Sequence, residues 1–169
     1  MALLTLPRRW GNRLIGRASM PAAMRQSGAI PYTIVKDQPV FLIITSRRTG
    51  RWIFPKGTPI EGMTPWEVAA TEAFEEAGVE GEIETTPIGS YQTAKMIGIR
   101  RTLIEVDMYP LRVQTQREDW PEKDNRHRHW VILPDAKRLL SDARLVELAA
   151  ALAGRVASDS QPAMGRISR

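Results

Sequence analysis

Apolar and acidic positions separate onto two sides of a helical pattern between residues 64 and 79. At about 100° per residue, one arc of this segment is apolar and the opposite arc is acidic. The apolar arc comprises Trp66, Ala70, Ala73, Phe74 and Ala77, and the acidic arc Glu72, Glu75 and Glu76. The pattern predicts a short helix that packs its apolar arc on a core and presents its glutamates to the preceding loop around Lys56 and Gly57.

Capping residues mark both ends of this helix. Thr64 is a good N-cap, Pro65 suits the first helical position, and Glu67 completes a Thr-x-x-Glu capping box. Gly78 is the expected left-handed residue after the last turn. The helix is therefore expected to begin at Pro65 and to end at Gly78.

Strands and two more helices are predicted from apolar runs, their periodicity and the turn residues between them. The predicted strands are Ala29–Lys36, Val40–Ser46, Arg51–Phe54, Thr102–Val113 and Trp130–Leu133, with a turn at Asp37-Gln38-Pro39. Residues 81–93 form a strand-rich stretch. The predicted helices are Pro134–Leu140 and Asp142–Ala153.

Length and composition narrow the class of protein. A chain of 169 residues suits one domain with a sizeable core. The absence of cysteine excludes disulfides and thiolate metal sites. No apolar run is long enough to cross a membrane, so we expect no membrane partner and a cytoplasmic location.

The positive net charge of +5 is concentrated near the N-terminus. Residues 1–28 contain five arginines and no acid, whereas the remainder has as many acids as bases. We interpret residues 1–28 as a basic flexible arm, residues 29–156 as the globular domain and residues 157–169 as a disordered tail. The alternatives for the arm are a targeting peptide and extra residues upstream of a start at Met20 or Met24. With Trp10 as its one interleaved aromatic residue, the arm does not indicate a nucleic-acid partner.

The three glutamates of the acidic arc indicate a cation site. No lysine or arginine lies within residues 67–79 to offset them through i,i+4 pairs. Mg²⁺ prefers oxygen ligands and commonly joins a few carboxylates to substrate phosphates. The pattern therefore favours a magnesium site that handles phosphate over the alternative of a solvated acidic face.

The segment from Gly57 to Val79 resembles the Nudix box, G-x5-E-x7-R-E-U-x-E-E-x-G-U, where U is a bulky aliphatic residue. The residues that match in register are Gly57, Glu72, Glu75, Glu76, Gly78 and Val79, while Ala73 is small for the first U position. This resemblance implies the Nudix fold, an α/β/α sandwich with a mixed β-sheet between helices.

Two box positions depart from the family pattern. Met63 stands where the family has its first Glu, and Thr71 where it has Arg. In the family the arginine helps to orient a box glutamate, so these departures put the orientation of Glu75 in question. Because both charges are absent, neither is left without its partner. Met63 can instead pack on Val68 as a hydrophobic staple.

The resemblance extends to the diphosphoinositol-polyphosphate phosphohydrolase branch of the family. The lead-in from Val40 to Gly57 contains a Ser-Arg pair and an Arg-Trp-x-x-Pro sequence like those of that branch. Residues 118–120 and 126–130 are similar to its acidic-Trp loop and basic-Trp strand. The similarity covers residues 29–152.

The resemblance implies an enzyme that hydrolyses a phosphoanhydride with a metal ion. Mg²⁺, or Mn²⁺ in its place, would be held by Glu72, Glu76 and the Gly57 carbonyl, and would lower the pKa of a bound water. The candidate general bases are Glu75 and Glu76 or, from a later loop as in some family members, Glu118 and Glu122.

Basic residues on both sides of the acidic helix are candidate phosphate ligands, because arginine forks bind phosphate oxygens bidentately. The candidates are Arg47, Arg51, Lys56, Lys95, Arg100 and Arg101. The expected partner is a phosphorylated small molecule, such as a diphosphoinositol polyphosphate or a dinucleoside polyphosphate. Clean-up of nucleoside triphosphates and a non-catalytic ligand-sensing module are the alternatives. The sequence carries no signal for the oligomeric state.

Two pairs of residues near the C-terminal third have both a structural and a functional interpretation. His127 and His129 lie two apart on a predicted strand and share a face; surface histidines are favoured over a metal site, because no third ligand is near in sequence. Trp120 and Trp130 suit base stacking or core packing, and packing is favoured for Trp130.

Overall fold

The computed structural model describes residues 24–159. The strands are β1 (Met24–Val35), β2 (Gln38–Thr45), β3 (Trp52–Ile53), β4 (Lys56–Gly57), β5 (Val79–Ile83), β6 (Gly89–Ile97), β7 (Arg100–Gln116) and β8 (Arg128–Ile132). The helices are α1 (Pro65–Ala77), α2 (Leu133–Leu139) and α3 (Ala143–Asp159), with a 3-10 turn at Lys123–Asn125. No helix in this part of the chain is long and apolar enough to cross a membrane.

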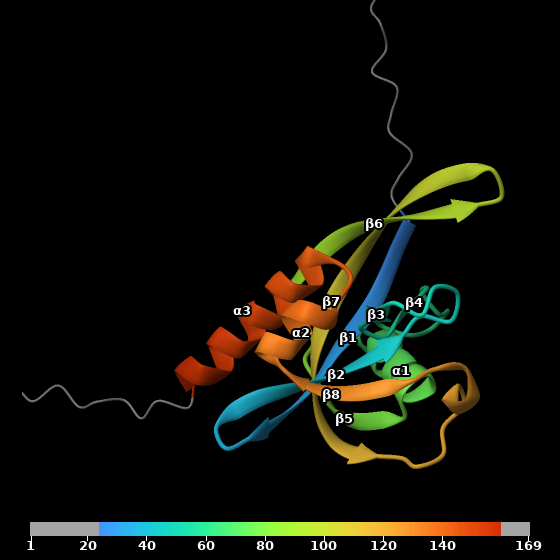
Figure 1. Ribbon diagram of the computed structural model, residues 1–169. Helices are drawn as coiled ribbons and strands as arrows, with labels where there is room; N and C mark the ends of the chain where they lie inside the picture. The colour runs from blue at the N-terminus through green and yellow to red at the C-terminus, as the bar shows by residue number, and fades with distance from the viewer. Residues whose placement is uncertain (1–23, 160–169) are drawn as a thin grey trace, which may run out of the picture.

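One mixed sheet holds all of the described strands. Its central path runs β3-β2-β1-β7-β5, while β4 pairs with β1, β6 with β7 and β8 with β2. Strands β1 and β7 are parallel, and the other pairs are antiparallel. The parallel pair of β1 and β7 lies in the middle of the sheet (Figure 1).

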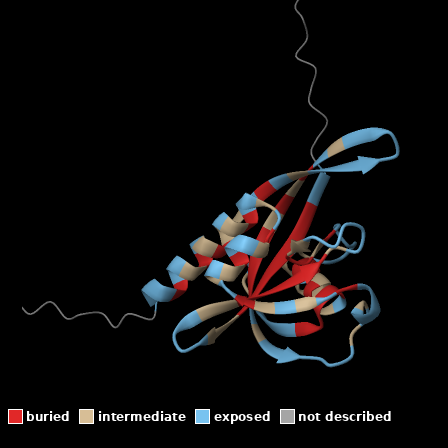
Figure 2. Cartoon of the chain, in the orientation of Figure 1, coloured by how far each residue is buried: buried red, intermediate tan, exposed pale blue. Residues whose placement is uncertain are grey.

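Helices cover both faces of the sheet, as Figure 1 shows. Alternating residues of β2 serve the two layers, because successive side chains of a strand point to opposite faces. Leu42 and Ile44 pack with Ala73 of α1, and Phe41 and Ile43 pack with the residues of α2 and α3. Burial is accordingly concentrated in the central strands (Figure 2). The predicted α/β/α sandwich with a mixed sheet is confirmed.

The domain is longer at both ends than the sequence predicted. Residues 24–28, which were assigned to the arm, form the start of β1, where Ser27 and Gly28 pair with β4 as well as β7. Residues 157–159, which were assigned to the tail, continue α3 beyond the buried Val156. The rest of the predicted arm and tail, with the alternatives for the arm, lies outside the described residues.

The first hairpin turn lies one residue earlier than predicted. Lys36 and Asp37 both have positive φ, at 49° and 60°, as a two-residue turn with the twist of a hairpin requires. Gln38 and Pro39, which were assigned to the turn, are the first residues of β2. Strand β4 was not predicted, and Leu133, which was assigned to a strand, begins α2.

Candidate active site

Helix α1 begins and ends where its capping residues predicted. Thr64 accepts a hydrogen bond from the backbone N–H of Glu67, while the Glu67 carboxylate accepts one from the Thr64 backbone. Gly78 is left-handed at φ 68°, and a Cβ there would lie 2.8 Å from the Trp120 ring. The two caps fix the ends of α1, and therefore the position of each glutamate along the helix.

The buried face of α1 differs from the predicted apolar arc. Its buried residues are Val68, Ala69, Ala73, Glu76 and Ala77, whereas Trp66, Ala70 and Phe74 are only half-buried. Glu76 is 7% exposed, Glu72 is half-buried and Glu75 is exposed. The three glutamates therefore do not share one solvent-facing arc, because groups from outside the helix cover Glu76.

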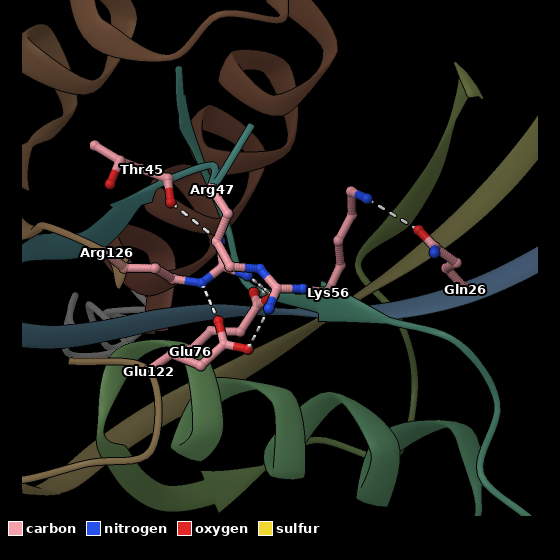
Figure 3. A network of polar contacts seen from close by, with 7 residues as sticks. All are labelled: Gln26, Thr45, Arg47, Lys56, Glu76, Glu122 and Arg126. Carbon is pink, nitrogen blue, oxygen red and sulfur yellow. Dashed lines mark hydrogen bonds and ion pairs between the residues drawn. The ribbon is translucent and has the colours of Figure 1, made fainter. Parts of the chain in front are cut away.

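Two donors hold the Glu76 carboxylate. The backbone N–H of Lys56 donates to Oε2 at 3.2 Å, and the Arg126 guanidinium forms an ion pair with Oε1 (Figure 3). Burial raises the pKa of Glu76 to about 7, and the positive charge of Arg126 opposes that rise. Glu76 is thus a buried acid whose charged form depends on the cations beside it.

Gly57 lies directly against Glu72. A Cβ on Gly57 would be 1.8 Å from Glu72 Oε1, so any larger residue would displace this carboxylate. Burial, and then the nearby charge of Glu75, raise the pKa of Glu72. The box glycine is required here because the loop and the helix approach so closely.

A cavity of about 620 Å³ opens beside Glu76. Its lining includes residues of the loop after β2, of β4, α1 and β6, of the loop before β8 and of the start of α3. The basic residues that line it are Arg47, Arg48, Arg51, Lys56, Lys95 and Arg126, and the acidic ones are Glu76 and Asp142. The structure thus brings four of the predicted phosphate ligands, Arg47, Arg51, Lys56 and Lys95, to the same cavity as Glu76.

Lys56 is tied to the sheet at the edge of this cavity. Its Nζ donates to Gln26 Oε1 at 2.9 Å. Burial lowers the pKa of Lys56, while the negative charge of Glu76 acts in the opposite direction. The backbone N–H of Lys56 donates to Glu76, and the side chain of Lys56 lines the cavity. One residue therefore contacts the buried carboxylate and also adds a positive charge to the cavity.

Arg100 and Arg101 lie apart from the other predicted ligands. They are in the hairpin of β6 and β7, opposite Ile97 and Met96, and they do not line the cavity. This hairpin extends beyond the body of the sheet (Figure 1). Because side chains alternate along a strand, Arg100 shares the face of Lys95, whereas Arg101 is on the opposite face.

Arg126, Glu122 and Gln26 also contribute contacts to the site. No role was predicted for Arg126 or Gln26, and Glu122 was considered only as a general base. Arg126 was noted only as part of the basic-Trp resemblance, and no spacing rule connects it to Glu76. Glu122 pairs with Arg126 and with Arg47 Nη1, the latter at 3.4 Å, and its backbone N–H donates to the Glu75 carbonyl. Of the two loop carboxylates considered as bases, Glu122 lies beside Glu76 and Glu118 interacts with Arg128.

The two positions that depart from the box are neighbours. The Thr71 hydroxyl donates to the Glu67 carbonyl at 2.8 Å and lies 3.9 Å from Met63 Sδ. Met63 is 44% exposed, so a staple onto Val68 stays a prediction. Glu75 has no side-chain partner among the contacts of residues 24–159.

The side chains of His129, Trp120 and Trp130 have partners within the fold. His129 lies against the Trp52 ring at 6.1 Å, and residues 24–159 contain no group of three or more His, Cys, Asp or Glu gathered to hold a metal. Trp130 packs on the layer of α1 and donates to Gln116 Oε1, as the packing interpretation predicted. Trp120 lies beneath the Arg128 guanidinium, at 3.9 Å from the ring centroid.

The comparison with known proteins identifies the family. The profile of the NUDIX domain matches residues 24–158. The chain belongs to the NUDIX domain family. It is 31% identical to Nudix hydrolase 13, mitochondrial, of Arabidopsis thaliana over 135 residues, which cover 67% of this chain and 65% of the relative. It is 28% identical to diphosphoinositol polyphosphate phosphohydrolase 2 of Rattus norvegicus over 125 residues, 69% of this chain and 62% of the relative.

A solved Nudix structure agrees with the fold. The chain is similar to the Ap4A hydrolase of C. elegans with a TM-score of 0.57 and 18% identity, over 79% of this chain and 98% of that one. At this identity the match concerns the fold. The alignments with the curated relatives above span just under two thirds of the length of each of those relatives.

Proposed function

We propose that this Nudix domain hydrolyses a phosphoanhydride bond in a polyphosphate-bearing small molecule with the help of Mg²⁺ or Mn²⁺. The proposal rests on one observation. The buried box residue Glu76 lines a cavity together with six basic side chains. An acidic helix edge beside a basic cavity suits a substrate whose phosphates bridge a metal ion to arginine and lysine.

The donor set fits a hard divalent cation by its chemistry. Glu72 and Glu76 would supply carboxylate oxygens, and Gly57, whose backbone carbonyl is the third proposed ligand, lies against Glu72. No three carboxylates within residues 24–159 meet closely enough to form a ready cage. A bound cation would supply charge neutralisation of the pyrophosphate and a water of lowered pKa.

The remaining chemistry belongs to the side chains of this chain. Lys56, Arg47 and Arg51 would bind and orient the phosphates at the cavity rim. Glu75 and Glu76 are the proposed bases within the box, and Glu122 is the proposed alternative from the loop, since it lies beside them. A base must reach the attacking water directly or through one further water.

The proposed substrate class is a diphosphoinositol polyphosphate or a dinucleoside polyphosphate. Support comes from the names of two similar proteins, a diphosphoinositol polyphosphate phosphohydrolase and an Ap4A hydrolase. The basic rim of the cavity supports it physically, because longer phosphate chains can contact more of its cations. A cytoplasmic location stays a prediction, since several relatives are named as mitochondrial or chloroplastic proteins.

A substrate panel tests the proposal. Dinucleoside polyphosphates, diphosphoinositol polyphosphates, nucleotide sugars and nucleoside triphosphates would be assayed for phosphate or nucleotide release with Mg²⁺, Mn²⁺ or EDTA. We expect metal-dependent release that is fastest with the polyphosphates. Ligand binding without release from any compound would favour the sensing module, and preference for nucleoside triphosphates would favour the clean-up enzyme.

Glu76→Gln tests the role of the buried carboxylate. The change keeps the size of the side chain and removes its charge, so we expect hydrolysis to fall about 10²-fold or more. Circular dichroism should show that the fold persists. Retained hydrolysis with unchanged metal dependence would contradict the assignment of Glu76.

A further inference from the structure

Arg126 lies where three elements meet around Glu76. Its guanidinium forms ion pairs with Glu76 and Glu122 and donates from Nη1 to the Thr45 carbonyl at 3.0 Å. These partners belong to α1, to the loop before β8 and to the end of β2 (Figure 3). The side chain is 5% exposed, so its donors are directed at protein groups.

Helix α1 supplies no cation for its own glutamates. Residues 67–79 contain no lysine or arginine, and the Thr71 hydroxyl is directed to Glu67 and Met63. Within residues 24–159, Arg126 is the basic side chain whose ion pair reaches a glutamate of the box. The charge that faces the box therefore comes from a residue 50 positions away from Glu76.

The Glu76 carboxylate is fixed at both of its oxygens. Arg126 engages Oε1, and the Lys56 backbone N–H donates to Oε2. A carboxylate oxygen has two lone pairs, so each oxygen keeps capacity for another ligand. Groups that hold a metal-binding side chain from behind fix its orientation, and their loss typically costs about 10–100-fold in metal affinity or activity.

We propose that Arg126 is a positioning residue that fixes the Glu76 carboxylate for divalent-metal binding. The inference rests on the proposed function, because it requires Glu76 to be a metal ligand. The planar guanidinium suits this role, since one fork reaches two carboxylates and a carbonyl, which the ammonium group of lysine cannot reproduce. Through Glu122 the same network continues to Arg47 at the rim of the cavity.

Mn²⁺ binding without substrate, measured by electron paramagnetic resonance, tests the inference. The variants are Arg126→Met, which removes the charge, and Arg126→Lys, which keeps the charge and loses the fork. Arg128→Met is the matched control, because Arg128 also binds α1, through the Ala77 carbonyl at 3.0 Å, but forms no ion pair with a glutamate of the box. Thermal melts of each variant report the structural cost separately.

We expect Arg126→Met to weaken Mn²⁺ binding about 10–100-fold and Arg126→Lys to weaken it by a smaller factor. Arg128→Met should lower the melting temperature and leave the Mn²⁺ affinity unchanged. At saturating metal, Arg126→Lys should lower kcat more than it raises KM, because the substrate contacts remain. If Arg126→Met does not fold, Arg126→Lys carries the test, since it leaves no unpaired buried carboxylate.

Three outcomes would overturn the inference. Wild-type affinity for Mn²⁺ in Arg126→Lys would show a purely structural role, and tighter binding in Arg126→Met would show that Arg126 competes with the metal. A rise in KM with unchanged Mn²⁺ affinity would make Arg126 a substrate ligand. The wild type separates this inference from the proposed function: if the wild type binds no Mn²⁺, the metal site itself is wrong whatever Arg126 does.

Discussion

At the scale of single residues, the environment of each glutamate in the box sets its chemistry. Glu76 is buried between Arg126 and the Lys56 backbone, Glu72 lies against Gly57, and Glu75 is exposed. Burial disfavours the charged form of an acid, while a nearby cation restores it. One helix thus presents three identical side chains in three different environments.

The departures from the box at positions 63 and 71 predict coupling between these positions. The Met63 sulfur and the Thr71 hydroxyl are already in contact, so Met63→Glu and Thr71→Arg together should form an exposed ion pair. We expect the double variant to be more stable than the sum of the single changes by about 0.5 kcal/mol. Urea unfolding of the four proteins in a double-mutant cycle measures this term. Additive single changes would show that the two positions are independent.

At the scale of elements, capping residues decide where the helices that frame the site begin. Thr64 and Gly78 define α1, and Asp142 precedes α3 at the edge of the cavity. Asp142 Oδ1 accepts from the backbone N–H of Arg144 at 3.0 Å, and Oδ2 pairs with the Arg144 guanidinium at 2.8 Å. These local interactions follow from sequence neighbours, which is why pattern reasoning recovers helix starts.

Asp142 should stabilise the fold in a pH-dependent way. Its hydrogen bonds from Arg144 lower its pKa below the ordinary value near 3.9. The ionised form therefore stabilises the native state above that pH, and the contribution is lost as the pH falls through the lowered pKa. Asp142→Ala should cost about 1 kcal/mol at neutral pH. Asp142→Asn, which keeps the cap and removes the charge, should cost less.

The pH series of unfolding free energies separates the charge of Asp142 from its capping geometry. The difference between the wild type and Asp142→Asn should stay constant from about pH 5 to 8 and shrink below about pH 4. An equal difference at pH 3 and pH 7 would mean that the carboxylate charge contributes nothing.

At the scale of the whole molecule, the sheet joins segments that are far apart in the chain. The cavity takes cations from the loop after β2, from β4, from β6 and from the loop before β8. The hairpin of β6 and β7 carries Lys95, Arg100 and Arg101 and extends beyond the body of the sheet (Figure 1). A ligand with a long phosphate chain could span from Lys56 to that hairpin, whereas a simple nucleotide sugar would contact the cavity alone.

This arrangement predicts different effects for two adjacent arginines. Arg100 lies opposite Ile97 and so on the face of Lys95, while Arg101 lies opposite Met96 on the other face. Arg100→Gln should raise the KM for long polyphosphates severalfold more than for a nucleotide sugar, and should reduce the salt dependence of binding. Arg101→Gln is the matched control and should change little. Equal effects of both changes on all substrates, or no effect, would make them ordinary surface charges.

The sequence alone determined the parts of this protein that depend on local interactions. Neighbours within a few residues set the caps of α1, the register of the box from Gly57 to Val79 and the apolar runs of the central strands. The long resemblance to the Nudix box then implied the sandwich that the structure shows. The predicted ranges of β1 and α3 were too short. Pairing with β7 extends β1, and packing on the sheet extends α3.

Only the tertiary structure decided which side of α1 is buried and which charges meet there. Three glutamates without a local cation read as one acidic arc, yet Glu76 is enclosed by Arg126, which lies 50 residues away. The same holds for Glu122, which also pairs with Arg47 of the loop after β2, and for Gln26, which accepts a hydrogen bond from Lys56 of β4. Local patterns fix the periodicity of a helix, but a buried charge is stabilised by contacts that form only in the folded chain.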